Sequence, residues 1–350
     1  MEIIFVVSAL HGGGAERVIV TLANQFAGRG DKVIILMTAG DEVAYRLEEE
    51  VEVVSIGQPS NGKLSKQIER ILKMRCFFKD HADSKIVSFT TTINMFTILA
   101  AAGLKNKVIV SERNDPNRCN FKPVRNLVYS WGKNFVFQTK GAMQCFPKKI
   151  RERSAVIPNP VRKDLPEIYT GIREKKIAAV GRLEAQKNHQ LLLEAFAGFH
   201  QKFPEYELHI FGKGRLEQEL KQRAADMGIG DKVIFEGFCS NVPERIRTYS
   251  MYVLSSDYEG ISNSLMEAMA LGLPCISTDC PIGGSALCIE SGQNGLLVPT
   301  GNAEELCDAM ELLARDTALA EQLGKNASAV RIRFGEESIC RQWREYILHE

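Results

Sequence analysis

The sequence predicts an α/β protein built from two doubly wound parallel-sheet domains. Its 350 residues exceed what one hydrophobic core usually holds, and at roughly 150 residues per domain they suggest two. Short β-branched apolar runs alternate with segments of helical period, a pattern typical of parallel sheets covered by helices. The connector Ile157-Pro158-Asn159-Pro160-Val161 separates two such series, because its prolines disfavour a helix.

Six short apolar runs, rich in valine and isoleucine, predict the strands of the first half. They lie at 3–7, 32–37, 51–56, 85–89, 108–111 and 134–138. Between the third and fourth runs apolar residues recur at helical spacing, so we expect a helix over 63–79.

A second series of strands follows the connector, at 177–180, 207–211, 233–236, 252–255, 274–277 and 295–298. Helical patterns then cover 303–315, 319–333 and 336–349. We expect a first domain over 1–162 and a second over 163–335, with the C-terminal helix 336–350 packed back on the first. Ligands of open parallel sheets bind beyond the carboxyl ends of the strands, so the loops there should carry the site.

The composition excludes several classes of protein. With 45% hydrophobic and 25% charged residues, the chain is neither disordered nor fibrous. It shows no basic leader and no apolar run of about 18 residues, so we expect neither export nor a membrane span. Nine scattered cysteines without a Cys-x-x-Cys pair predict reduced thiols rather than a zinc site.

The formal net charge of +1 conceals two oppositely charged halves. Residues 1–160 carry 23 basic and 15 acidic side chains, and residues 161–350 carry 21 and 28. Two basic clusters stand out: Lys63, Lys66, Arg70, Lys73 and Lys79, and then Lys148, Lys149, Arg151 and Arg153. Such segments can lie on an anionic bilayer, although an ordinary solvated face is the alternative. Nucleic acid is not expected as a partner, since no binding module accompanies the charge.

A glycine turn, Gly12-Gly13-Gly14, follows the first predicted strand and opens a helix that continues with Ala15, Glu16 and Arg17. Glycines let a backbone approach an anion, and a helix N-terminus offers unpaired amides. The spacing is not the G-x-G-x-x-G of dinucleotide-binding proteins. Two interpretations remain, a phosphate-binding turn and a tight turn without chemical role.

In the second domain, Arg182 and Lys187 lie in the loop after the strand that ends at Val180. A guanidinium and an ammonium at one sheet edge suit a diphosphate, although both are also ordinary surface charges. A second glycine turn, containing Gly212 and Gly214, follows the next strand at the same edge.

The stretch over 255–274 contains a strand end, a loop with Glu259 and a helix from about Ser262 that includes Glu267. The amides of Asn263, Ser264 and Leu265 are expected to be unpaired donors for a phosphate. Carboxylates accept hydrogen bonds from vicinal diols, so the two acids suit sugar hydroxyls and a ribose. The alternative is an exposed loop acid and a helix-favouring acid.

Together these motifs resemble the retaining glycosyltransferases of family 4, which have the GT-B fold. The Glu-x7-Glu pair Glu259 and Glu267 carries the resemblance, together with four further segments: 12–17, 158–160, 181–189 and 294–299. The match spans nearly the whole chain. Ser111-Glu112-Arg113-Asn114-Asp115-Pro116 and Asp279-Cys280-Pro281 are similar to the subgroup that adds hexoses or N-acetylhexosamines to lipid-linked oligosaccharides for bacterial surface polysaccharides or N-glycans.

The resemblance implies two Rossmann-like domains facing a cleft, a UDP-sugar as donor, and neither a cofactor nor a metal. Arg182 and Lys187 would neutralise the donor diphosphate in place of Mg²⁺. Glu259 would contact the donor sugar and Glu267 the ribose. The first domain would contribute Gly13 and Gly14 to the phosphates. Glu16 and Gly212 are also expected to bind the substrate.

Two departures from the family pattern follow. Many relatives place a histidine near the donor, whereas the corresponding loops here read Thr90-Thr91-Thr92 and Glu112-Arg113-Asn114, and His11 is the one histidine at a ligand-facing turn of that domain. We expect Glu112 or Arg113 to position the acceptor instead. The run Gly283-Gly284-Ser285 also replaces the expected Gly-Pro-(basic)-Glu.

The resemblance predicts a cytoplasmic enzyme associated with the inner face of the cell membrane, moving a sugar to a lipid-linked or growing glycan. A nucleotide-sugar epimerase of similar architecture is the first alternative. A nicotinamide-dependent oxidoreductase is the second, disfavoured because neither glycine turn has the G-x-G-x-x-G spacing. A non-catalytic sugar-binding module is the third.

Overall fold

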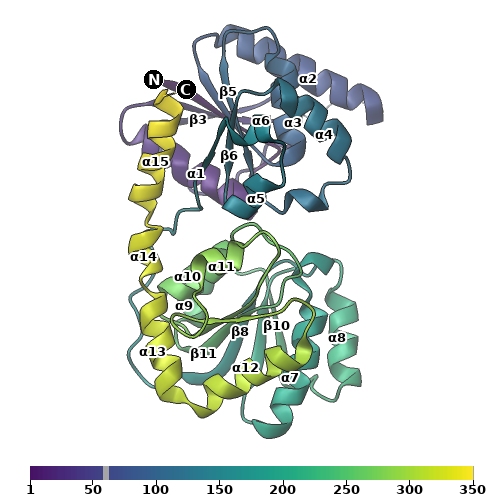
Figure 1. Cartoon of the computed structure of the whole chain (residues 1–350), viewed down its shortest axis with the longest axis vertical. Helices are drawn as coiled ribbons and strands as arrows, with labels where there is room; N and C mark the ends of the chain where they lie inside the picture. Colours follow the sequence, from purple (N-terminus) through teal and green to yellow (C-terminus); the bar gives the residue numbers. More distant parts are fainter. Residues whose placement is uncertain (58–62, 350) are drawn as a thin grey trace. The chain divides into compact units, whose positions relative to one another are not determined.

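The chain divides into two compact units (Figure 1). A computed structural model describes residues 1–57 and 63–349. The first unit comprises Met1–Pro160 together with Glu336–Glu350, and the second comprises Val161–Gly335. The chain thus passes from one unit to the other within the proline-rich connector and again after Gly335.

The first unit is a seven-stranded parallel sheet of order β3-β2-β1-β4-β5-β6-β7. Its strands are β1 (Glu2–Val7), β2 (Lys32–Met37), β3 (Val51–Ser55), β4 (Lys85–Phe89), β5 (Lys107–Glu112), β6 (Asn134–Phe137) and β7 (Ser154–Val156). The sequence pattern missed β7, because three half-buried residues are too few to show a period.

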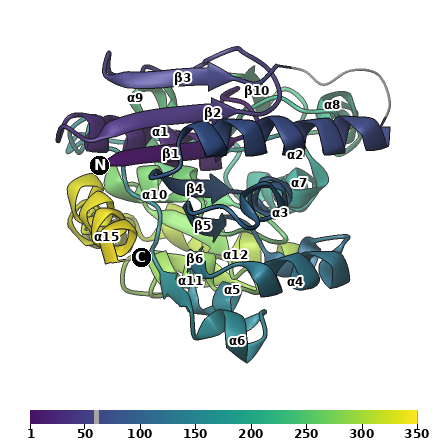
Figure 2. The same cartoon turned by 90° about the horizontal axis from the view of Figure 1, so that it is seen from above.

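Helices cover both faces of this sheet (Figure 2). They are α1 (Gly14–Ala27), α2 (Lys63–Asp80), α3 (Thr91–Ala101), η1 (Pro116–Arg118), α4 (Lys122–Trp131), α5 (Lys140–Gln144), α6 (Lys148–Arg151) and α15 (Glu336–His349). On one face Ile4 and Val6 of β1 pack with Met74 and Ile93 of α2 and α3. Side chains alternate along a strand, so Phe5 points the other way.

The opposite face is covered by α1 and by the C-terminal helix α15, which lie side by side. The rings of Phe5 and Phe26 are 6.0 Å apart. From α15, Trp343 is fully buried and Arg344 donates to the Asp31 carboxylate at 2.9 Å. The helix that ends the chain is therefore part of the first unit's core.

The second unit is a six-stranded parallel sheet of order β10-β9-β8-β11-β12-β13. Its strands are β8 (Glu174–Val180), β9 (Glu207–Phe211), β10 (Val233–Gly237), β11 (Tyr249–Leu254), β12 (Cys275–Thr278) and β13 (Leu296–Val298). Its helices are η2 (Ala185–Lys187), α7 (His189–Lys202), α8 (Glu217–Asp226), α9 (Val242–Ile246), α10 (Asn263–Ala270), α11 (Gly284–Cys288), α12 (Ala303–Arg315), α13 (Thr317–Ala327) and α14 (Val330–Arg333). The two doubly wound parallel sheets predicted from the sequence are confirmed.

One helix expected from the sequence is two. The pattern over 319–333 predicts a single helix, but α13 ends at Ala327 and α14 begins at Val330. Between them the amides of Ala329 and Arg331 donate to carbonyls three residues earlier, which interrupts the α-helical ladder. Within residues 1–57 and 63–349, none of the helices has the length and apolar character that crossing a bilayer requires.

Candidate active site

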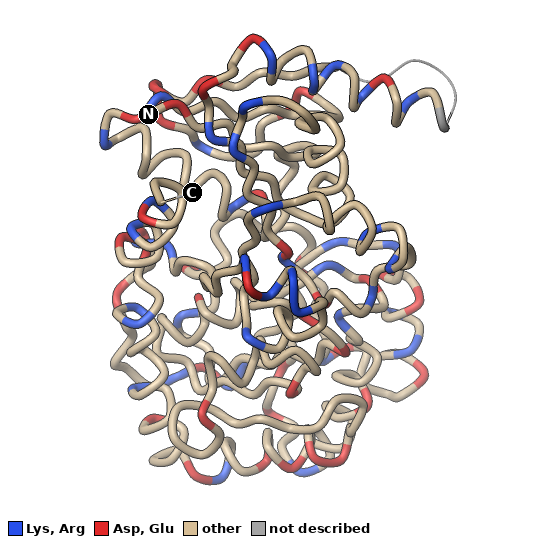
Figure 3. The backbone as a smooth tube through the Cα atoms, turned by 45° about the horizontal axis from the view of Figure 1, so that its top comes forward, with Lys and Arg blue, Asp and Glu red and all other residues tan. Residues whose placement is uncertain are grey.

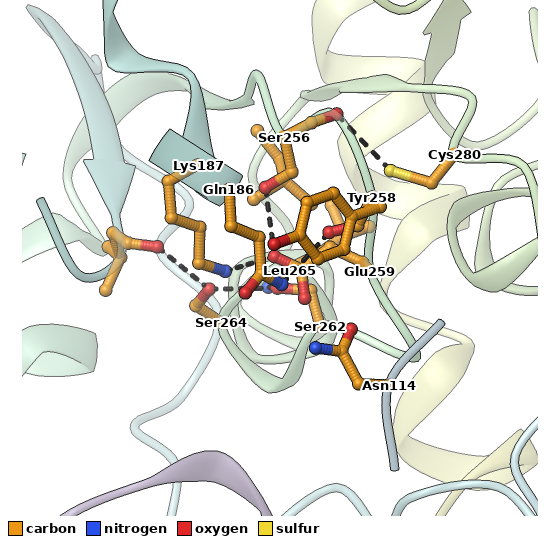
Figure 4. A network of polar contacts seen from close by, with 12 residues as sticks. Asn114, Gln186, Lys187, Ser256, Tyr258, Glu259, Ser262, Ser264, Leu265 and Cys280 are labelled. Atoms are coloured by element: carbon orange, nitrogen blue, oxygen red, sulfur yellow. Dashed lines mark hydrogen bonds and ion pairs between the residues drawn. The ribbon is translucent and has the colours of Figure 1, made fainter. Parts of the chain in front are cut away.

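Two loops at the carboxyl ends of β8 and β11 are joined by hydrogen bonds in the second unit (Figure 4). Gln186 donates to the Tyr258 carbonyl at 3.0 Å, and Asn188 donates to the Asp257 carboxylate at 2.7 Å. The Asp257 amide returns a bond to the Gln186 carbonyl at 3.0 Å. The arrangement fixes the segment before α7 against the loop before α10.

This junction brings the predicted residues Lys187 and Glu259 into an ion pair (Figure 4). Their side chains are 14% and 10% exposed. The Ser256 hydroxyl donates to the same carboxylate oxygen, Oε1, at 2.9 Å. A Cβ on Gly181 would lie 2.9 Å from Cε of Lys187, so the glycine leaves room for the lysine side chain. The site therefore contains a partly buried ion pair of an ammonium and a carboxylate.

Arg182 lies in the same loop and is exposed to solvent. Within the part of the chain that the structure describes, its guanidinium forms no ion pair. No group of three or more His, Cys, Asp or Glu side chains among those residues is placed to hold a metal. This loop therefore carries two cations, the ammonium of Lys187, which is paired with Glu259, and the exposed guanidinium of Arg182.

Gly212 has a structural role in the second glycine turn. Its φ of +144° lies in the region that favours glycine, and a Cβ there would lie 1.9 Å from the Gly181 carbonyl oxygen. The Gly181 amide in turn donates to the Phe211 carbonyl at 2.9 Å. Gly212 therefore allows the turns after β8 and β9 to approach closely.

Helix α10 begins at Asn263 with Ser262 as its N-cap. The Leu265 amide donates to the Ser262 hydroxyl at 3.4 Å, so the expectation that this amide is unpaired is wrong. The Ser264 hydroxyl accepts from the Tyr252 hydroxyl at 2.9 Å and donates to the Val180 carbonyl at 3.2 Å. These bonds tie the start of α10 to the end of β8.

The second acid of the pair, Glu267, lies one turn further along α10 and is buried, with 8% of its surface exposed, as is Glu259. Burial raises the pKa of the Tyr252 hydroxyl well above its usual value, and the charges of Glu259 and Glu267 act in the same direction. Both carboxylates are thus buried, which excludes the alternative that Glu259 is an exposed loop acid.

Three neighbours of this site were not assigned a role from the sequence: Ser256, His189 and Cys280. Burial, followed by the Lys187 ammonium, lowers the pKa of His189 to about 4, so its imidazole is neutral at neutral pH. Burial, followed by the Glu259 charge, raises the pKa of the Cys280 thiol to about 12. His189 and Cys280 lie in segments that carry the family resemblance, whereas the contact of Ser256 with Glu259 is visible only in the folded chain.

In the first unit, the amides of the glycine turn have an internal partner. Gly12 and Gly13 donate to the Glu16 carboxylate at 2.9 and 3.0 Å. Helix α1 begins at Gly14, and Gly12 has a φ of +113°. Glu16 therefore serves as a helix cap in the ligand-free chain, and its contact with substrate stays a prediction.

Glu112 is the last residue of β5 rather than a loop residue, and it is buried. Its role in positioning an acceptor stays a prediction. It accepts from the Thr91 hydroxyl at 2.9 Å and from the Tyr129 hydroxyl. Burial raises the pKa of its carboxyl above the usual range. The side chain belongs to a polar network inside the first unit.

Arg113 is buried as well, and its contact with an acceptor likewise stays a prediction. Its guanidinium lies 4.8 Å from the Phe89 ring centre and 6.0 Å from that of Trp343, and it donates to Asn159. Burial lowers its pKa to about 9. Arg113 thus links the sheet to helix α15 and to the proline-rich connector.

The chain matches known glycosyltransferases along its length. Residues 12–165 match "Glycosyltransferase Family 4" and residues 167–330 match "Glycosyl transferases group 1". An uncharacterized glycosyltransferase of Haemophilus influenzae is 26% identical over 97% of this chain and 98% of its own. An α-1,4-N-acetyl-D-galactosaminyltransferase of Campylobacter jejuni, whose name specifies an undecaprenol-diphosphate-linked acceptor, is 28% identical over 99% and 98%.

Solved structures share the fold. The Anabaena protein HepE, in complex with UDP-glucose, superposes with a TM-score of 0.87 at 19% identity, covering 100% of both chains. The staphylococcal protein TarM superposes with a TM-score of 0.81 over 99% of this chain and 98% of its own, at 14% identity. With two matched domains and the arrangement of both sheets, the chain belongs to the family 4 glycosyltransferases of the GT-B fold and acts in polysaccharide or glycan biosynthesis.

Proposed function

We propose that the enzyme transfers a hexose or N-acetylhexosamine from a UDP-sugar to a lipid-linked or growing glycan, with retention of anomeric configuration and without a metal at the diphosphate. It acts in the cytoplasm on the inner face of the cell membrane. Two similar proteins support the donor and acceptor classes: HepE is crystallised with UDP-glucose, and the Campylobacter relative is named for an undecaprenol-diphosphate-linked glycan acceptor.

The ion pair between Lys187 and Glu259 is the observation that carries the proposal. In the ligand-free chain each charge compensates the other. A nucleotide-sugar offers each charge a substitute partner: phosphate oxygens for the ammonium of Lys187 and sugar hydroxyls for the carboxylate of Glu259. Donor binding therefore exchanges one internal ion pair for two substrate contacts, with Arg182 as a second cation and Glu267 as the acceptor of ribose hydroxyls.

The chemical step separates the sugar from its leaving diphosphate. As the bond from the anomeric carbon to the phosphate oxygen breaks, negative charge grows on the diphosphate, where Lys187 and Arg182 stabilise it. In a same-face displacement the acceptor oxygen bonds to the anomeric carbon, and its proton passes to the leaving phosphate. This route retains configuration and needs no carboxylate nucleophile on the opposite face of the sugar.

The glycine turn of the first unit contributes through Gly13 and Gly14 in this proposal. A phosphate that approaches it competes with the Glu16 carboxylate for the amides of Gly12 and Gly13. Glu16→Gln weakens that internal competitor while it keeps a hydrogen-bonding cap.

Ligand-induced stabilisation tests the donor class. We expect a UDP-sugar, among UDP-, GDP- and ADP-sugars, to raise the Tm by an amount that grows with the logarithm of its affinity. The Glu259→Gln variant should bind UDP at least as tightly as wild type, because Lys187 no longer has an ion pair to give up, and should lose the additional stabilisation that the sugar supplies. Stabilisation by GDP- or ADP-sugars alone, or a product of inverted configuration, would contradict the proposal.

A further inference from the structure

Helix α4 of the first unit presents an apolar stripe to solvent. Phe121, Val124, Leu127 and Trp131 follow one another at helical spacing and are 64%, 55%, 60% and 59% exposed. The inward side of the same helix is already filled by Arg125, Val128 and Tyr129. The inward side is thus already packed within the first unit, and the outer apolar stripe is available to bind something outside the chain.

The surroundings of this stripe are strongly basic. Between residues 116 and 153 the sequence has nine Lys or Arg side chains and one acid, Glu152. Helix α6, which packs against α4, exposes Lys148, Lys149 and Arg151, and Lys122 is exposed at the start of α4. Figure 3 marks the basic and acidic positions along the chain. An occupant of this face must combine apolar groups with negative charge.

A second copy of the chain does not have that chemistry. In a symmetric dimer through this face, the same basic segment would meet itself, and like charges would oppose association. An anionic bilayer combines apolar groups with negative charge. Its phosphate headgroups pair with Lys and Arg, while aromatic and aliphatic side chains enter the boundary with the acyl chains.

The basic helix α2 is a less suitable anchor. It exposes Ile68 and Leu72, at 53% and 56%, but several of its cations have partners in the protein. Arg70 lies 5.8 Å from the Phe96 ring centre, and Lys73 donates to the Ile56 carbonyl at 3.2 Å. The side chain of Lys63 lies outside the described residues.

We infer that α4 and α6 form the membrane-docking surface, with Phe121, Val124, Leu127 and Trp131 inserted at the lipid interface and the α6 cations on anionic headgroups. The inference rests on the proposed lipid-linked acceptor and deepens it, because it specifies how the enzyme meets the bilayer that holds this substrate.

Tryptophan fluorescence tests the inference directly. The chain has two tryptophans, and Trp343 is fully buried whereas Trp131 is 59% exposed. Vesicles of phosphatidylglycerol should shift the emission to shorter wavelength, and vesicles of phosphatidylcholine should shift it far less. The Trp131→Phe variant should lose the shift. An unchanged emission of wild-type protein with anionic vesicles would overturn the inference.

A flotation assay with matched variants distinguishes insertion of α4 from nonspecific binding to vesicles. Leu127→Ser should weaken binding to anionic vesicles at least about tenfold, because it places a polar group at the lipid interface. Ile332→Ser, at an 86% exposed position in the second unit, should leave binding unchanged. Equal binding by Leu127→Ser and wild type would overturn the inference. So would self-association that Leu127→Ser abolishes in the absence of vesicles.

The same variants distinguish this inference from the proposed function. Leu127→Ser should keep the Tm increase with UDP-sugars while it loses vesicle binding. If wild-type protein binds vesicles through α4 but no UDP-sugar stabilises it, the proposed donor is wrong and the docking surface stands. If UDP-sugars stabilise a protein that ignores anionic vesicles, the docking surface is wrong and the donor stands.

Discussion

Replacement of Lys187 by methionine tests the central pair of charges. The methionine keeps an unbranched apolar chain of similar length beside Gly181 and removes the ammonium. In the free protein this leaves the Glu259 carboxylate with the Ser256 hydroxyl as a donor. In the proposed donor complex it removes one of the two cations that would face the diphosphate.

The two consequences have different sizes. Loss of one partner from a fully buried ion pair costs about 3–5 kcal/mol, and from an exposed pair about 0–1 kcal/mol. With side chains 14% and 10% exposed, an intermediate loss of about 1–3 kcal/mol is expected, which lowers the Tm by about 2–4 °C for each kcal/mol. Loss of charge stabilisation at the leaving group should lower kcat about 10²- to 10³-fold.

A double variant separates stability from catalysis. In Lys187→Met/Glu259→Gln no buried charge is left uncompensated, so the Tm should recover part of the loss while activity stays low. Lys175→Met is the matched control, since Lys175 pairs with Glu205 at 2.7 Å with both side chains well exposed. That control should keep full activity and a Tm within about 1 °C of wild type.

Steady-state kinetics with the donor identified by ligand stabilisation, combined with thermal unfolding, give the required numbers. A folded Lys187→Met enzyme that retains activity within about threefold of wild type would refute the reasoning, because the leaving group would then lack the proposed dependence on this cation.

Three further predictions concern stability. The pKa of His189 is lowered from 6.5 to about 4, so between these pH values the unfolded chain binds more protons than the folded chain. The free energy of unfolding should therefore fall by up to about 3 kcal/mol as the pH drops through this window. His189→Gln should flatten the dependence of Tm on pH. Gly212→Ala should prevent the normal fold or lower the Tm strongly, since its Cβ would lie 1.9 Å from the Gly181 carbonyl oxygen. Gly292→Ala is the control: Gly292 has a φ of +81° and open space around it, so this variant should lose only the stability that backbone strain costs. Ser262→Ala removes the N-cap of α10 and should cost about 0.5–2 kcal/mol in chemical denaturation; an unchanged midpoint would contradict that role.

Much of the fold follows from local patterns. Strands such as β2 and β9 have the predicted bounds because their apolar runs are flanked by turn residues on both sides. Fully buried parallel strands need continuous apolar runs, and helices need a 3.6-residue period, so each element is visible within its own segment. Because ligands bind at the carboxyl edge of such sheets, the loops with Lys187 and Glu259 were also predictable.

Several of the predicted site residues are already hydrogen-bonded within the protein. The amides of Gly12 and Gly13 are occupied by Glu16, the Leu265 amide by Ser262, and Glu112 by an internal network. Each residue type was compatible with substrate binding. Whether its polar groups are already satisfied depends on neighbours and burial, which motif spacing alone does not reveal.

Three features therefore depend on the folded chain. Lys187 and Glu259 are 72 residues apart in sequence, and only the parallel arrangement of β8 and β11 makes them partners. Glu112 and Arg113 are removed from water by Tyr129, Trp343 and the strands around them. On α4, apolar residues occur on both sides, and packing against the rest of the first unit determines which of them remain exposed. A helical period specifies the relative positions of side chains on a helix, but not the side that neighbouring elements cover.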